Sequence, residues 1–266
     1  MLKILSLSLA LLMGTSTPAL TRDVPLPDAV RMTATDWPPF AGKDLPDQGA
    51  SIALIRDVFA RAGLPLEVKF AAWQRSLTTA LADEGFLATG PVYYSKDRED
   101  ICHFSAPIGQ SKVGFVQRKD TPIRWEQLED LTGVRIGAVS GYVNEAEFDK
   151  MAHDQTLDVS TVHNDALNLR RLAFGRIDLA VIDEANMRYL LSSDKKLEPY
   201  RELLEMNSRY LITNDHLICF KKSDTGEKLR DLFNAHYDAE KDGGLLSAKI
   251  DEISRWMAAR NQMDAR

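Results

Sequence analysis

Short runs of β-branched residues alternate with amphipathic segments along this chain, and this alternation constrains the fold more than any other feature. Val30–Thr35 and Leu66–Ala71 have the composition of strands. Between them, Ser51–Ala62 places its apolar residues on one face of a helix, and Gly63 ends that helix. Strands separated by helices of about 10–15 residues predict β-α-β units and mostly parallel sheets.

The alternation continues to the end of the chain in two sets, separated near residue 118 by a turn at Thr121-Pro122. Further strands are predicted at 86–89, 114–117, 134–139, 157–162, 177–182 and 216–220, and further helices at 73–83, 125–131, 144–153, 164–174, 184–192, 225–240 and 245–260. Two sets predict an α/β fold of two lobes, each with its own separate sheet. In such sheets a ligand lies beyond the carboxyl ends of the strands, so residues that follow strands are the first candidates for a site.

The first residues have the pattern of a cleavable signal peptide. Lys3 precedes the apolar run Ile4–Met13, and Thr17 and Ala19 suit the positions before a cleavage point. The run is too short to span a bilayer. An N-terminal strand or anchor helix is the alternative. We therefore expect residues 1–19 to be a signal peptide and the mature protein to be periplasmic.

Charge and cysteine content exclude several classes of function. The chain has 33 basic and 39 acidic residues, a net charge of -6 and no run of Lys and Arg, which argues against nucleic acid as a partner. No His or Cys spacing typical of metal sites occurs, and no nucleotide-binding glycine motif, so we expect neither metal nor cofactor. Surface or structural roles are expected for the histidines. For Cys102 and Cys219 we favour free thiols over a disulfide, although export would permit one.

Five short motifs resemble a known family in their order and spacing. They are Asp36–Phe40, Ser95–Arg98, Phe104–Pro107, Gly137–Gly141 and Gly175–Asp183. Together, over about residues 29–257, they resemble the family 3 extracellular solute-binding proteins, which bind polar amino acids for ABC importers.

This resemblance implies a periplasmic binding protein type II-like fold. Each lobe would be a mostly parallel sheet flanked by helices, and two crossover strands would join the lobes. Lobe 1 would comprise residues 24–115 and 213–266, and lobe 2 residues 120–208. The implied function is capture of a small polar ligand, an amino acid or a related carboxylate, by closure of the cleft. The implied partner is a membrane ABC permease, and the expected state is a monomer.

Two charged residues are the main candidates for holding such a ligand. The resemblance places Arg98 at the carboxylate-binding position, and a guanidinium can donate two parallel hydrogen bonds to a carboxylate. The alternative for Arg98 is an exposed turn, paired with Asp97 or Glu99. Asp183 follows an apolar strand and could hold a ligand ammonium group, or cap the helix that begins near Glu184.

Of three aromatic residues near strand ends, we expect one to line the cleft and two to pack in the core. Trp37 lies in a proline-flanked loop after a strand, so we expect it to form a wall of the cleft. An aromatic face over a cationic ligand contributes about 0.5–2 kcal/mol. Trp73 and Phe40 are expected to pack in the core.

Two glycines and a tyrosine complete the set of candidate binding residues. Gly90 and Gly141 follow strands, where bare backbone can approach a ligand. Tyr142 stands where the family usually has a hydroxyl residue, and Pro91 likewise replaces a small hydroxyl residue and lacks an amide hydrogen. These departures favour a different carboxylate or a larger ligand.

Two other functions remain open from the sequence. A periplasmic enzyme on the same scaffold, similar to cyclohexadienyl dehydratase, could use Asp183 or Glu184 as a general acid. A binding protein could also present its liganded form to a membrane receptor. Fold alone does not separate these functions.

Overall fold

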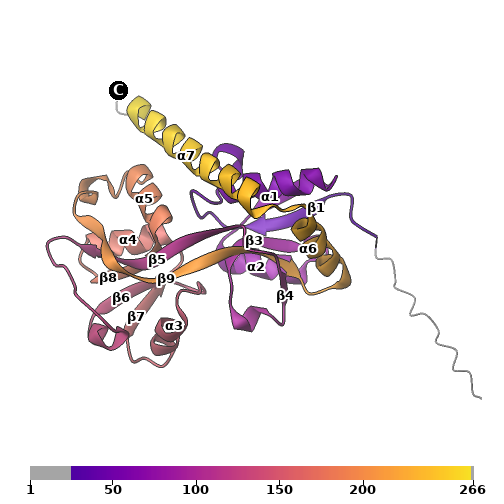
Figure 1. Ribbon diagram of the computed structural model, residues 1–266. Coiled ribbons are helices and arrows are strands. Elements are labelled where there is room, and N and C mark those ends of the chain that lie inside the picture. The colour runs from indigo at the N-terminus through magenta and orange to yellow at the C-terminus, as the bar shows by residue number, and fades with distance from the viewer. Residues whose placement is uncertain (1–24, 265–266) are drawn as a thin grey trace, which may run out of the picture.

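The computed structural model describes residues 25–264, which form two lobes lying side by side (Figure 1). The expected signal peptide, residues 1–19, lies outside the described residues. The first lobe contains β1 (Val30–Ala34), α1 (Ala50–Arg61), β2 (Leu66–Phe70), α2 (Trp73–Ala82), β3 (Ala88–Tyr93), β4 (Cys102–Phe104) and α6 (Asp224–His236). The second lobe contains β6 (Arg135–Val139), α3 (Ala146–His153), β7 (Asp158–Val162), α4 (Asp165–Ala173), β8 (Leu179–Asp183) and α5 (Glu184–Ser193).

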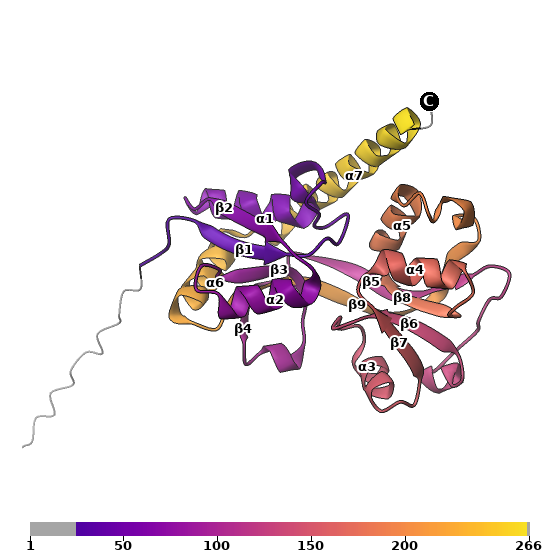
Figure 2. The ribbon, with the colours of Figure 1, turned by 180° about the vertical axis from the view of Figure 1, so that it is seen from behind.

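Two long strands run from one lobe into the other, as the fold class predicts (Figure 2). They are β5 (Gly109–Arg118) and β9 (Leu204–Lys221). They pair antiparallel from Gly109 opposite His216 to Arg118 opposite Leu204, and the register shifts on both sides of Gly114. The two strands that connect the lobes are thus hydrogen-bonded to each other over most of their length.

The prediction of two separate sheets is wrong. The strands are hydrogen-bonded in the continuous order β2-β1-β3-β9-β5-β8-β6-β7. The cause is the crossover strands: β9 pairs with β3 of the first lobe, β5 pairs with β8 of the second, and β5 and β9 pair with each other. The parallel part of the prediction is confirmed within each lobe, where β1 pairs with β2 and β3, and β6 with β7 and β8.

The predicted strands were too short at the crossover. The sequence indicated strands at 114–117 and 216–220, but β5 begins at Gly109 and β9 at Leu204. The added part of β5 is polar, and residues such as Gln110 and Ser111 alternate between exposed and half-buried positions. The added part of β9 mixes polar with apolar residues, and most of them are half-buried or exposed. These residues lack the apolar signal of a core strand because they cross between the lobes instead of lying inside one.

The C-terminal helix, α7 (Ala239–Asp264), extends from the first lobe toward α5 of the second (Figures 1 and 2). The sequence predicted a break near Gly243 and Gly244, since each glycine costs about 1 kcal/mol in a helix interior. The helix continues through them because its apolar face, including Leu246 and Ile253, packs into the first-lobe core. Near its far end, Asn261 Nδ2 donates to the Ser192 carbonyl of α5 at 2.8 Å.

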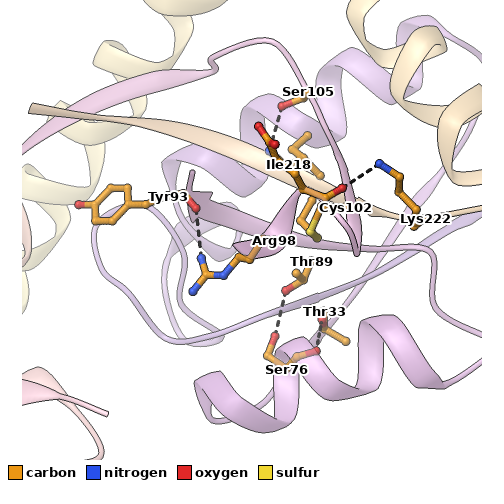
Figure 3. The surroundings of a disulfide bond; sticks show 11 residues. Thr33, Ser76, Thr89, Tyr93, Arg98, Cys102, Ser105, Ile218 and Lys222 are labelled. Atoms are coloured by element: carbon orange, nitrogen blue, oxygen red, sulfur yellow. Dashed lines mark hydrogen bonds between the residues drawn. A yellow bond between two sulfur atoms is a disulfide. The ribbon is translucent and has the colours of Figure 1, made fainter. Parts of the chain in front are cut away.

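Each lobe has its own core, and a disulfide lies in the first. One cluster combines β1, α1 and the α6–α7 region, and two others belong to the second lobe. Cys102 and Cys219 form a disulfide with their Cα atoms 5.1 Å apart, so the expectation of free thiols is wrong (Figure 3). The antiparallel pairing of β4 with β9 places Phe104 opposite Cys219 and thereby brings the two thiols together.

Candidate ligand-binding site

A cavity lies between the lobes, at the carboxyl ends of the first-lobe strands. Seven of its lining residues come from the first lobe and two from the second: Thr35, Trp37, Trp73, Pro91, Val92, Tyr93, Arg98, Tyr142 and Val143. Four of these side chains are aromatic, and Arg98 carries the only charge among them. The cavity is therefore an apolar, aromatic chamber with one cationic group.

Arg98 is held at the cavity by a short turn and by an aromatic face. It ends the 3₁₀ turn Lys96–Arg98, is only 8% exposed, and its guanidinium lies 4.9 Å from the Trp73 ring. Its hydrogen bonds go to two backbone carbonyls, of Tyr93 at 3.1 Å (Figure 3) and of Gly141 at 3.5 Å. Within residues 25–264 it forms no ion pair. The expected alternative, an exposed turn paired with Asp97 or Glu99, is not what the structure has.

Burial lowers the pKa of Arg98, and Asp149 and Asp97 partly oppose that shift. An arginine remains charged under any physiological condition. A buried guanidinium that faces a cavity and lacks a carboxylate partner is suited to bind an anion, because a charge-assisted pair offsets its desolvation.

Gly141 of the second lobe contacts the first lobe beside the cavity. It has φ +76° at the end of β6, and its carbonyl accepts from the Trp73 indole Nε1 at 2.7 Å. A Cβ at this position would lie 2.2 Å from Nε2 of Gln74. The positive φ therefore favours glycine here, and a larger residue would also displace the exposed end of the Gln74 side chain.

Asp183 does not line the cavity, and each of its oxygens accepts a hydrogen bond from a neighbouring residue. It is 5% exposed and ends β8. Its Oδ1 accepts from the backbone N–H of Asn186 at 3.0 Å, so it caps α5, and its Oδ2 accepts from the Tyr93 hydroxyl at 3.1 Å. Burial raises the pKa of Asp183, whereas hydrogen bonds from Ser111, Asn186 and Tyr93 lower it.

A chain of hydrogen bonds continues from Tyr93 into the crossover strands. The Tyr93 hydroxyl is 2.9 Å from Ser111 Oγ, which is 2.8 Å from Nε2 of His216. His216 is fully buried against Trp37 and Phe40, with ring centroids 4.8 and 4.4 Å apart. Burial lowers the pKa of His216 to about 3, so the ring is neutral. Its structural role was expected, but its complete burial at the hinge was not.

Tyr142 connects the cavity to a second buried acid. Its hydroxyl donates to Oδ2 of Asp165 at 3.3 Å, and the same oxygen accepts from Nδ2 of Asn186 at 3.0 Å. Asp165 is 6% exposed, and burial raises its pKa to about 7. It lines a neighbouring part of the cleft between the lobes.

The candidate residues from the sequence divide into two groups. Trp37, Arg98 and Tyr142 line the cavity, and the carbonyl of Gly141 contacts two of its residues. Gly90 and Asp183 do not line it. Gly90 lies within β3 because that strand continues to Tyr93, and a Cβ there would meet Ile218 of β9.

Sequence reasoning missed three residues near the site: Trp73, Tyr93 and Asp165. Trp73 packs against the core around the disulfide, as expected, but it also lines the cavity and contacts Arg98. Tyr93 lies beyond the predicted end of its strand. Asp165 follows the expected cap Asn164 and resembled an ordinary first-turn acid.

Residues 30–257 match the family of bacterial extracellular solute-binding proteins, family 3. The chain belongs to this family. A curated relative of this family 3 protein is the lysine/arginine/ornithine-binding periplasmic protein of Escherichia coli (strain K12). It is 28% identical over 184 residues, which cover 67% of this chain and 69% of the relative.

Solved structures show the same fold. A histidine kinase sensor domain with similarity to periplasmic binding proteins has a TM-score of 0.71 at 19% identity, covering 85% of this chain and 95% of that one. An amino acid ABC transporter substrate-binding protein from Streptococcus pneumoniae, bound to L-arginine, has a TM-score of 0.68 at 16% identity, with coverage of 85% and 95%. The family 3 protein therefore has the type II periplasmic binding protein fold, as its sequence predicts.

Proposed function

We propose that this solute-binding protein captures a small carboxylate, an amino acid or a related acid, in the cavity between its lobes. The observation that supports the proposal is Arg98, a buried guanidinium at the cavity without an ion-pair partner among the described residues. Relatives that bind lysine, arginine and ornithine or L-arginine support a ligand of this class.

In this proposal the protein captures its ligand by closing the cleft between the lobes. Lobe 1, residues 24–115 and 213–266, and lobe 2, residues 120–208, move as units about β5 and β9. A ligand shifts the equilibrium toward the closed form in proportion to its differential contacts with both lobes. Cavity residues from both lobes, such as Arg98 and Tyr142, support this mechanism.

The protein acts in the periplasm and delivers its ligand to a membrane ABC permease. The family and the Cys102–Cys219 disulfide support an oxidising compartment. Within residues 25–264, none of the helices has the length and apolar character of a membrane span. If the partner is a membrane receptor instead, the liganded protein should still bind to membranes from cells that lack the permease genes.

Binding is proposed in preference to catalysis. Of the two candidate general acids, Asp183 accepts hydrogen bonds from fixed partners and Glu184 pairs with Arg188. Neither lines the cavity.

The experiment is a calorimetric titration of the mature protein with amino acids and small organic acids found by a thermal-shift screen. Arg98→Ala is expected to lower the affinity for the best ligand at least a hundredfold while the protein stays folded. Arg31→Ala is the matched control, because Arg31 is exposed and pairs with Glu67 at the sheet edge. Equal affinity in the Arg98 and Arg31 variants would defeat the proposal.

A further inference from the structure

This inference rests on the proposed function, capture of a carboxylate by Arg98. The side chains that line the cavity then determine which carboxylates it can bind. Arg98 supplies one positive charge. Around it stand aromatic and aliphatic side chains, including Trp37, Trp73, Tyr142 and Val143. Such a wall favours a ligand with one carboxylate and an apolar or aromatic body.

An α-amino acid also brings an ammonium group, which needs acceptors inside a desolvated site. Among the described residues, no Asp or Glu lines this cavity. Asp183, the residue expected from the sequence to hold an ammonium group, lies outside the lining, and its two oxygens accept from the Asn186 N–H and the Tyr93 hydroxyl. The Tyr93 ring is itself part of the cavity wall, so Asp183 lies behind it.

Asp149 and Asp165 do not line the cavity either. Asp149 accepts from the backbone N–H and the side-chain amide of Asn144, both at 2.8 Å. Asp165 accepts from Tyr142 and Asn186 and faces a different part of the cleft. The cavity can therefore neutralise a carboxylate, but its lining supplies no carboxylate for an ammonium group.

The structure assigns this cavity to monocarboxylates without an ammonium group next to the carboxylate, such as 2-oxo acids and aryl- or alkyl-carboxylic acids. Arg98 binds the carboxylate, and the aromatic wall covers the apolar body. A 2-oxo group adds only an acceptor and leaves no buried cation unpaired. The family relatives named above bind cationic amino acids, so this inference separates the present chain from them.

The test is calorimetry on the mature, disulfide-bonded protein with matched pairs of increasing size. The pairs are pyruvate and L-alanine, 4-methyl-2-oxopentanoate and L-leucine, and phenylpyruvate and L-phenylalanine, with L-arginine added. We expect at least one oxo acid to bind at least tenfold more tightly than its amino acid. Arg98→Ala should abolish that binding, and Arg31→Ala should preserve it.

Two results would overturn the inference and are distinguishable from failure of the proposed function. If L-arginine or another amino acid binds more tightly than every oxo acid, through Arg98, the inference is wrong and the proposed function stands. If no oxo acid binds, the assigned class is wrong. If no probe of either class binds, the binding role assigned to Arg98 fails as well.

Tyr93→Ser tests the role of the aromatic ring directly. The shorter residue keeps a hydroxyl but opens the wall in front of Asp183. The ratio of oxo-acid to amino-acid affinity should fall at least tenfold, because Asp183 becomes accessible to an ammonium group. Tyr94→Ser is the control, since Tyr94 is exposed and bonds to Glu99. An unchanged ratio in a Tyr93→Ser protein that melts cooperatively would contradict the assignment.

Discussion

The Trp73 indole of the first lobe donates to the Gly141 carbonyl of the second at 2.7 Å, across the mouth of the cavity. The same carbonyl accepts a longer hydrogen bond, 3.5 Å, from Arg98. The side chain that faces the ligand cavity thus also contacts the opposite lobe, so the two lobes meet at the residue proposed to bind the ligand.

Gly141→Ala should weaken ligand binding about tenfold. Gly141 has φ +76°, so an alanine would shift the backbone carbonyl that accepts from Trp73 and Arg98, and its Cβ would displace the end of the Gln74 side chain. Gly175→Ala is a matched control, because Gly175 has φ +68° and a Cβ there meets nothing within 4 Å. Both variants should lose about 1 kcal/mol of stability from the left-handed backbone. Calorimetry and chemical unfolding separate the two effects, and equal affinity losses would contradict the closure contact.

Asp165→Asn should stabilise the protein at alkaline pH. The pKa of Asp165 is raised from 3.8 to about 7, so the folded state favours its protonated form. Its contribution to stability is complete below the unfolded pKa and is lost as the pH rises through 7. The loss is about 4 kcal/mol at most. The amide introduced at 165 can donate to Oδ1 of Asn186, which lacks a partner among the described residues.

The measurement is urea unfolding of wild type and Asp165→Asn at pH 5 and pH 8. The advantage of the variant should appear at pH 8 and shrink at pH 5. Asp158→Asn, at an exposed position on β7, should show no such difference. The prediction would be wrong if the difference in unfolding free energy between Asp165→Asn and wild type were the same at pH 5 and pH 8.

His216 acts in the opposite direction at acid pH. Its pKa is lowered from 6.5 to about 3, so the folded state favours the neutral ring. That stability is present above the unfolded pKa and is lost as the pH falls from about 6.5 toward 3. In Asp165→Asn, where the opposing group is absent, unfolding free energy should fall more steeply below pH 6 than in wild type. A parallel decline in the two proteins would count against this interpretation.

Loss of the disulfide should cost about 2–5 kcal/mol of stability. Cys102 and Cys219 are 117 residues apart in sequence, and a bond across such a separation strongly restricts the unfolded chain. The double variant Cys102→Ser/Cys219→Ser should unfold at lower urea concentration than the oxidised wild type and match the reduced wild type. Identical midpoints with and without reductant would show that the bond contributes nothing.

Asn261→Ala should weaken ligand binding about two- to fivefold without lowering stability much. Its side chain donates to Ser192 of α5 and so joins α7 to the second lobe. A net hydrogen bond of this kind contributes about 0.5–1.5 kcal/mol. Ser254→Ala is the control, because that hydroxyl bonds only within α7. Small-angle scattering of the unliganded variants should show a larger radius for Asn261→Ala alone.

The sequence predicted the architecture and part of the site because both depend on local patterns. Apolar periodicity located the helices, and the rule that ligands lie beyond strand ends pointed to Trp37 and Tyr142, whereas Arg98 came from the resemblance to the family. Tyr93 was missed because its partner Asp183 is distant in sequence, and no local pattern reports such a contact. The crossover parts of β5 and β9 were missed for a related reason: their pairing with each other, and not a local pattern of burial, makes them strands.

The disulfide has a mechanical consequence for how the molecule bends. It fastens the first-lobe end of β9 to β4, so that end of the strand cannot slide or twist freely. Bending must then concentrate further along, where the ladder between β5 and β9 slips register around Gly114. We therefore expect the bending point to lie within the β5–β9 ladder and not at the first-lobe end of β9, which the disulfide holds covalently.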